Sequence, residues 1–226
     1  MRRAALAALL AVALAGCGSS STTGSAGRAT LWVTRDRGAQ VLHVASVPAG
    51  ESVLQALDRL ADVKTRFGGR YVRSVDGVSE HGQRAWFYYV NGYLADRGSA
   101  DYRLHAGDLA WWDYRAWRNP AQDPLVVGAF PQPFLNGYGG KRRKTVVVSS
   151  EPARVRAIAR RLHASVAASA PDGDENVLVV EQGGPGRARL SFTGSTSPGS
   201  PVRLVFRGDP KILLRRWPFR FRYAVG

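Results

Sequence analysis

The sequence has very little of the side-chain chemistry on which catalysis and metal binding usually depend. It contains one cysteine and four histidines among 226 residues. A single cysteine cannot form an intramolecular disulfide, and no histidine lies in a metal-ligand spacing. Neither a Gly-x-Ser-x-Gly frame nor a phosphate-binding loop is present. We therefore expect no catalytic residues, no metal and no resident cofactor, and predict that the chain is not an enzyme.

Acidic residues are also scarce, because 17 Asp and Glu stand against 32 Lys and Arg, a net charge of +15. Such a chain is attracted to anionic surfaces, among them lipid headgroups and acidic polymers. The arginines are spread along the chain, so a solvated basic surface without a partner is the alternative. No nucleic-acid partner is expected, because the N-terminus predicts an extracytoplasmic protein.

The N-terminus has the layout of a secretory signal. Two arginines, Arg2 and Arg3, precede an apolar run from Ala4 to Ala15, which is shorter than the roughly 20 residues needed to span a bilayer. The run ends Leu14-Ala15-Gly16-Cys17, which resembles a bacterial lipobox. It predicts a signal peptide over residues 1–17, lipidation (as by palmitate) at Cys17, and a cell-membrane anchor on the extracytoplasmic face. An ordinary signal peptide that contains a cysteine is the alternative.

The remaining chain divides by composition into a tether and two domains. Residues 18–28 are rich in Gly, Ser and Thr and predict a flexible tether. Two prolines, Pro120 and Pro124, mark a boundary between a domain at 29–119 and a second domain at 125–226. No family is evident for the second domain.

The pattern in the first domain predicts two strands, a helix and then three strands. Ser52 and Gln55 form a capping-box pattern before the helix, which Gly68-Gly69 closes. The later strands are expected at 71–75, 84–90 and 109–117. This order is β-grasp-like, and the fold class is α+β.

The second domain is expected to be a strand-rich α+β domain as well. A helix capped by Ser150 is predicted from Glu151 to about Ala168, with Val155, Ile158, Leu162 and Val166 on one stripe. Strands are expected at the following segments: 125–130, 145–149, 176–181, 189–193, 202–207 and 216–223.

Two aromatic strands are the densest feature of the chain. Because side chains alternate along a strand, Trp86 and Tyr88 face one way while Phe87 and Tyr89 face the other. In the strand expected at 109–117, Trp111 lies on the face opposite to that of Trp112 and Tyr114. One aromatic face can pack on the helix. The other needs cover, either from the second domain or from a ligand.

These segments carry a resemblance. The run W-F-Y-Y-V-N-G at 86–92 is followed by Gly98, Tyr102 and A-G-D at 106–108, and is preceded by G-E-S-V-L-Q-A-L at 50–57 and G-G-R-Y-V-R-S-V-D-G at 68–77. Residues 40–117 thereby resemble the transcobalamin C-terminal-like domain, the small β-domain of transcobalamin and intrinsic factor, which also occurs in bacterial surface lipoproteins.

The resemblance implies a binding role. In the carriers this domain caps a corrinoid against a larger helical domain, and the residues that touch the ligand match Trp86, Phe87 and Tyr88. The helical domain is absent here, so cobalamin binding would need another partner or has been lost. Two functions follow: a non-catalytic binding module for a corrinoid or another flat hydrophobic ligand, or a surface protein whose basic faces bind an anionic envelope polymer, lipid or a protein partner.

Cys17→Ser is expected to abolish acylation and membrane retention, because the thiol is the acceptor of the lipid. Metabolic labelling with a fatty acid, followed by membrane fractionation, measures both. Label that persists on the serine variant would contradict the lipoprotein assignment.

Overall fold

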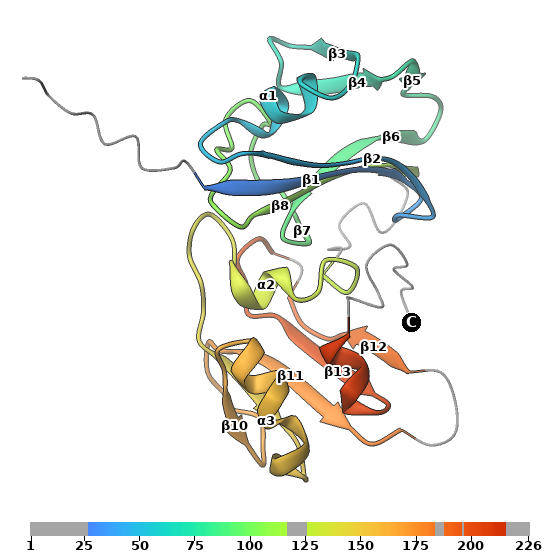
Figure 1. The fold of residues 1–226 in the computed structure, drawn as a ribbon. Coiled ribbons are helices and arrows are strands. Elements are labelled where there is room, and N and C mark those ends of the chain that lie inside the picture. The colour runs from blue at the N-terminus through green and yellow to red at the C-terminus, as the bar shows by residue number, and fades with distance from the viewer. Residues whose placement is uncertain (1–26, 117–125, 184–187, 196, 216–226) are drawn as a thin grey trace, which may run out of the picture.

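The computed structural model describes residues 27–116, 126–183, 188–195 and 197–215, and shows a strand-rich α+β chain built from three sheets with few helices (Figure 1). Cys17 and the strand expected at 216–223 lie outside the described residues. No helix in the described part of the chain is long and apolar enough to cross a membrane.

The first sheet has the strand order β2-β1-β8-β6-β7. Its two central strands, β1 and β8, run parallel, and every other neighbouring pair is antiparallel. Parallel neighbours need a long connection between them, and here it contains all the elements from β2 to β7. The strands are β1 (Arg28–Arg35), β2 (Gln40–Pro48), β6 (Arg84–Val90), β7 (Tyr93–Leu94) and β8 (Leu109–Ala116).

Helix α1 (Val53–Asp58) and a three-stranded sheet, β3-β4-β5, form a layer beside the first sheet (Figure 1). The predicted capping box is confirmed, because Ser52 and Gln55 bond reciprocally through side chain and backbone. The helix does not continue to Gly68-Gly69. It ends at Asp58, and residues Val63–Arg66 form a strand that pairs with β4. The apolar residues before this strand recur at helical spacing, so the sequence did not predict it. The small sheet consists of β3 (Val63–Arg66), β4 (Tyr71–Val75) and β5 (Val78–Ser79).

The second half of the chain contains a sheet of order β10-β9-β11-β13-β12, parallel except for the edge strand β12. Its inner strands are valine-rich runs, as expected for parallel strands covered on both faces. The elements are β9 (Thr145–Val148), α3 (Pro152–Arg161), β10 (Ser165–Ala167), β11 (Asn176–Glu181), β12 (Arg189–Phe192), β13 (Arg203–Arg207) and the 3-10 helix η1 (Pro210–Leu214).

Two predictions for this half are wrong. Helix α3 has Glu151 rather than Ser150 at its N-cap and ends at Arg161. The chain then turns at His163, which has φ of 50°, and Val166 lies in β10 rather than on the helical stripe. The segment expected as a strand at 125–130 forms turns from 126 onward and leads into α2 (Gln132–Leu135). Pro131 and Pro133 directly follow this segment and lack the N–H that a strand ladder requires, so no strand can continue past Phe130.

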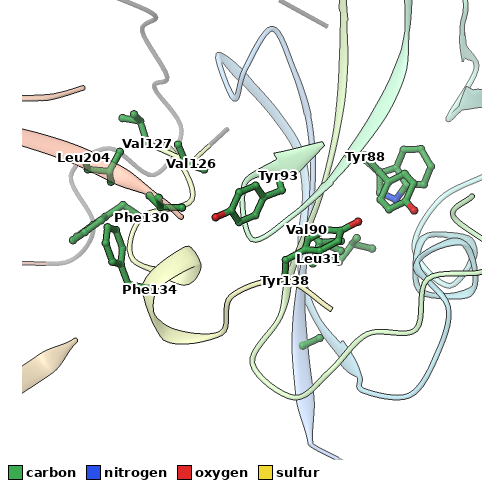
Figure 2. Packing of buried hydrophobic residues seen from close by; sticks show 14 of the residues in the cluster. Leu31, Tyr88, Val90, Tyr93, Val126, Val127, Phe130, Phe134, Tyr138 and Leu204 are labelled. Carbon is green, nitrogen blue, oxygen red and sulfur yellow. The ribbon is translucent and has the colours of Figure 1, made fainter. Parts of the chain in front are cut away.

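The aromatic alternation is confirmed by two buried clusters, one on each face of the first sheet. Trp86, Tyr88, Trp112 and Tyr114 belong to the larger cluster, and Tyr89 and Trp111 to the smaller one. The larger cluster continues without a break into the second half, through Val126, Phe130, Phe134 and Leu204 among others (Figure 2). The predicted domains at 29–119 and 125–226 therefore have separate sheets but share buried side chains, and their independence stays a prediction.

Candidate functional site

The structure places the three residues suggested by the resemblance within the packed sheet. Trp86 is 4% exposed, and its indole N–H donates to the Val78 carbonyl at 2.8 Å. Tyr88 is 8% exposed, lies beside Trp112 and donates its hydroxyl to the Arg97 carbonyl. Phe87 is half-buried on the opposite face. The strand thus does not bring the three side chains to one open surface.

The second aromatic face is also covered. Trp32, Tyr89 and Trp111 are buried there, and Ala129 of the second half packs against them. Behind Trp111 runs a buried polar chain, in which the indole N–H donates to the Thr34 hydroxyl at 2.7 Å and that hydroxyl donates to Asp113 at 2.6 Å. Burial raises the pKa of Asp113. The second half of the chain therefore covers at least part of this face, as one of the two expected alternatives requires.

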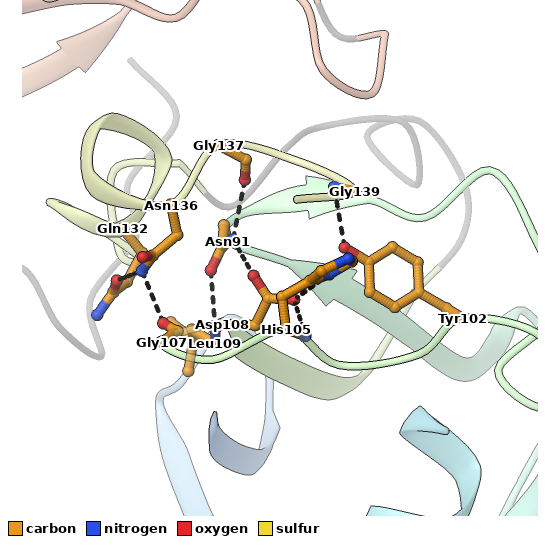
Figure 3. Close-up of polar contacts among 10 residues, drawn as sticks. All are labelled: Asn91, Tyr102, His105, Gly107, Asp108, Leu109, Gln132, Asn136, Gly137 and Gly139. Carbon is orange, nitrogen blue, oxygen red and sulfur yellow. Dashed lines mark hydrogen bonds and ion pairs between the residues drawn. The ribbon is translucent and has the colours of Figure 1, made fainter. Parts of the chain in front are cut away.

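A tight turn between β6 and β7 positions the residue that joins the two halves. Asn91 and Gly92 have φ of 51° and 92°, the left-handed pair that a two-residue hairpin requires. Asn91 is fully buried, and its amide donates to Asp108 and to the Gly137 carbonyl, both at 2.8 Å, while accepting the Leu109 N–H at 2.8 Å (Figure 3). Both N–H donors and the carbonyl oxygen of the amide thereby have partners, one of them across the junction.

Further polar contacts cross the same junction. The Tyr102 hydroxyl accepts the Gly139 N–H at 3.0 Å, and the Asn136 amide donates to the Gly107 carbonyl at 2.7 Å (Figure 3). Tyr93 donates its hydroxyl to the Ser200 carbonyl at 2.6 Å. The Tyr138 ring lies 5.8 Å from that of Tyr93 and 5.6 Å from that of Tyr102, measured between centroids. Tyrosines of both halves therefore pack together beside the Asn91 amide.

A pocket of about 470 Å³, here called the junction pocket, opens beside Tyr138 and has walls from both halves. That volume is within the range of small-ligand sites, roughly 300–1,000 Å³. Four of its residues are cationic and one is acidic. The lining consists of Asp96, Arg97, Tyr138, Gly139, Lys141, Arg142, Arg143, Pro198 and Gly199.

Backbone carbonyls hold two of these cations in place. Arg142 donates to the carbonyls of Phe134 at 3.1 Å and Leu162 at 2.9 Å. Arg143 donates to the Gly199 carbonyl at 2.9 Å and lies 3.5 Å from the Asp174 carboxylate. Carbonyls position the Arg142 guanidinium without neutralising its charge, whereas Arg143 also has the Asp174 carboxylate nearby. With four cations and one carboxylate in its lining, the pocket is electropositive.

The acidic member of the pocket is held by neighbours on both sides. Tyr138 donates its hydroxyl to Asp96 at 2.6 Å, and Arg97 donates to the same carboxylate at 3.0 Å. The Tyr138 hydrogen bond, followed by that of Arg97, holds the pKa of Asp96 below its ordinary value of 3.8. Burial and the bond to Asp96 raise the pKa of Tyr138. At neutral pH the pocket therefore combines an ionised carboxylate, a neutral phenol and four cations, of which Arg97, Lys141 and Arg142 are exposed.

Comparisons with known proteins concern the first half. Residues 50–116 match the family described as Domain of unknown function (DUF4430), an interval that runs from just before α1 to the end of β8. A search of curated proteins gives no match. Among the described residues, no group of three or more His, Cys, Asp or Glu side chains could hold a metal ion.

Two solved structures are similar to parts of the chain. A protein of Ruminococcus gnavus ATCC 29149, described as a candidate metal-binding protein, is 17% identical over 40% of this chain and 97% of its own, with a TM-score of 0.33. Haptocorrin in complex with Cbi is 13% identical over 44% of this chain, with a TM-score of 0.34, and this chain spans 28% of its length.

The residues of this site can be seen in the sequence, but the sequence does not show that they lie together. The sequence shows Asn91 at the end of an aromatic run and four consecutive basic residues from Lys141 to Lys144. Neither pattern shows that Arg97 lies beside the basic run, because the contact joins segments more than 40 residues apart. The usable signal is that polar Asn91 stands directly after an apolar strand.

Asn91→Gly is expected to lower the free energy of unfolding by about 1–3 kcal/mol, because glycine keeps the left-handed turn but leaves the Leu109 N–H and the Gly137 carbonyl without their partner. Urea denaturation measures the loss. Asn136→Ala is the matched control, since it removes a less buried amide from the same junction and should cost less. Equal costs for the two variants would contradict the role of Asn91.

Tyr138→Phe is expected to move the pKa of Asp96 up toward 3.8, because the largest cause of its depression is removed. The wild-type hydrogen bond contributes stability above that ordinary pKa and loses it as the pH falls through the depressed value, so the stability difference between the two proteins should shrink in acid. Carboxyl NMR titration measures the pKa. Tyr102→Phe, whose hydroxyl bonds Gly139 instead, should leave Asp96 unchanged.

Proposed function

We propose that this chain is a non-catalytic binding module, anchored to the extracytoplasmic face of a membrane through lipidated Cys17, whose junction pocket binds an anionic group of the cell envelope. The observation that carries the proposal is the pocket itself. It sets Arg97, Lys141, Arg142 and Arg143 around one cavity that contains a single carboxylate, Asp96.

Phosphate is the anion that this lining fits best. Guanidinium groups bind phosphate oxygens through paired N–H donors, and a lysine adds a mobile charge. Gly139 and Gly199 add backbone that a ligand can approach closely. A phosphate of a wall polymer and one of a lipid headgroup share this chemistry, and the experiment below separates them.

The corrinoid function suggested by the resemblance has less support. It requires Trp86, Phe87 and Tyr88 to meet a ligand, whereas Trp86 and Tyr88 are buried and their polar atoms already bond to carbonyls. The parallel pair β1–β8 between two antiparallel hairpins does agree with a β-grasp-like arrangement. We therefore carry the binding role forward and assign it to the junction pocket, with cobalamin as the comparison ligand.

Calorimetric titration of the Cys17→Ser chain with inorganic phosphate, soluble poly(glycerol phosphate), a short-chain phosphatidylglycerol below its micelle concentration, and glycerol tests the proposal. Phosphate-bearing probes should bind and glycerol should not. The tighter of the polymer and the lipid identifies the source of the phosphate. Cobalamin, followed by absorbance, should give no saturable change.

Lys141→Gln should weaken phosphate binding about 10- to 150-fold, the usual range for loss of one charge-assisted hydrogen bond. Lys144→Gln is the matched control, because Lys144 belongs to the same basic run, is exposed and does not line the pocket. Equal effects of the two variants would show that phosphate is held by diffuse electrostatic attraction and not in the pocket. Cobalamin binding that Trp86→Ala abolishes would reinstate the corrinoid function.

A further inference from the structure

The turn between β3 and β4 exposes the most accessible large apolar side chain of the described residues. Phe67 is 78% exposed, whereas the other two exposed apolar residues, Val41 and Val44, are 43% and 46% exposed. A single exposed apolar residue is common on protein surfaces, so the exposure of Phe67 gains meaning only together with its backbone and its charged neighbours.

The backbone of Phe67 is unfavourable for its residue type. Its φ is 54°, in the left-handed region where a side chain with a Cβ atom costs roughly 1–2 kcal/mol relative to the right-handed conformation. Gly68 and Gly69, which follow, have φ of 66° and 85° and adopt this region at little cost. A third glycine would relieve the strain. Strain that persists without a packing gain is typical of functional positions.

The turn is nevertheless firmly supported. Strand β3 pairs antiparallel with β4 up to the turn, and the Leu54 side chain of α1 packs against Gly69, 3.1 Å from where a Cβ atom would lie. Arg66, just before the turn, forms an ion pair with Glu80 at 2.9 Å. Phe67 is therefore presented on a braced hairpin.

Basic residues flank Phe67 along the hairpin. Lys64, Arg66, Arg70 and Arg73 are all exposed on β3, the turn and β4. Glu80 is the carboxylate that pairs with Arg66 and Arg73, and no ion pair within the described part of the chain involves Lys64 or Arg70. The hairpin tip thus combines one exposed aromatic side chain with uncompensated cations.

We propose that this tip docks onto an anionic lipid bilayer, with the Phe67 ring in the interfacial region and Lys64 and Arg70 on the headgroups. Aromatic rings favour the interface, and a basic residue near an anionic surface adds attraction that salt screens. The β3-β4-β5 sheet lies at the end of the molecule away from the β9–β13 sheet, so docking leaves the junction pocket accessible (Figure 1). This contact is separate from the lipid anchor and from phosphate binding.

Sedimentation of the full Cys17→Ser chain with phosphatidylglycerol/phosphatidylcholine vesicles tests the proposal. The Cys17→Ser chain without further substitutions should partition onto anionic vesicles, and less so as salt rises. Phe67→Gly should lower the partition coefficient at least about tenfold through lost apolar transfer. Lys64→Gln and Arg70→Gln should each lower it about fivefold. Val44→Ser is the matched control and should have no effect.

Thermal unfolding distinguishes a docking role from a structural one. Phe67→Gly should unfold at the same temperature as the parent chain or higher, because glycine removes the backbone strain. A lower unfolding temperature, unchanged partition of Phe67→Gly, or equal binding to pure phosphatidylcholine would each overturn the proposal. No vesicle binding at all would also overturn it and would leave a protein partner as the explanation for Phe67. Phosphate binding measured on Phe67→Gly should be unaffected, so failure here and failure of the junction pocket are distinguishable.

Discussion

The buried amide of Asn91 is the contact on which the arrangement of the two halves depends. A side-chain amide enclosed away from water must satisfy its donors and its acceptor, and Asn91 does so with Asp108, Leu109 and Gly137. Asp108 and Leu109 lie at the start of β8 in the first half, and Gly137 belongs to the second half, so the bonds fix the position of one half against the other. Asn91 is fully buried, so water cannot replace these bonds, which makes their loss costly.

The position of this brace explains the chemistry beside it. Arg97 follows the hairpin that Asn91 turns, and Tyr138 follows the glycine that Asn91 binds, so the same contact brings a cation of one half to the basic run of the other. Carbonyls hold Arg142 without neutralising its charge, Arg143 lies between the Gly199 carbonyl and the Asp174 carboxylate, and Tyr138 keeps Asp96 ionised. The electropositive pocket is a property of the docked halves, since neither half alone supplies all its walls.

The sequence predicted features that depend on neighbours along the chain. Alternation placed Trp86 and Tyr88 opposite Tyr89, and Ser52 with Gln55 identified the helix start, because both rest on local geometry. It did not predict β3, whose residues continue an apparent helical spacing but pair with β4, or the early end of α3, where His163 adopts a left-handed turn. It could not predict the junction pocket, because the approach of Arg97 to Lys141 depends on how the sheets dock. Phe67 did not stand out in the sequence, because Gly68 and Gly69 are enough to predict a turn there.

Native-state hydrogen exchange, read residue by residue by NMR, tests the central claim most directly. Two amides report on the junction: Leu109, which donates to the Asn91 side chain, and Gly139, which donates to the Tyr102 hydroxyl. The account predicts that Gly139, although in a loop, exchanges with an opening free energy close to that of Leu109 and of the amides that join β6 to β8. Exchange of Gly139 at the rate of an unprotected loop, while β6 and β8 stay protected, would show that the halves open independently and would contradict the account.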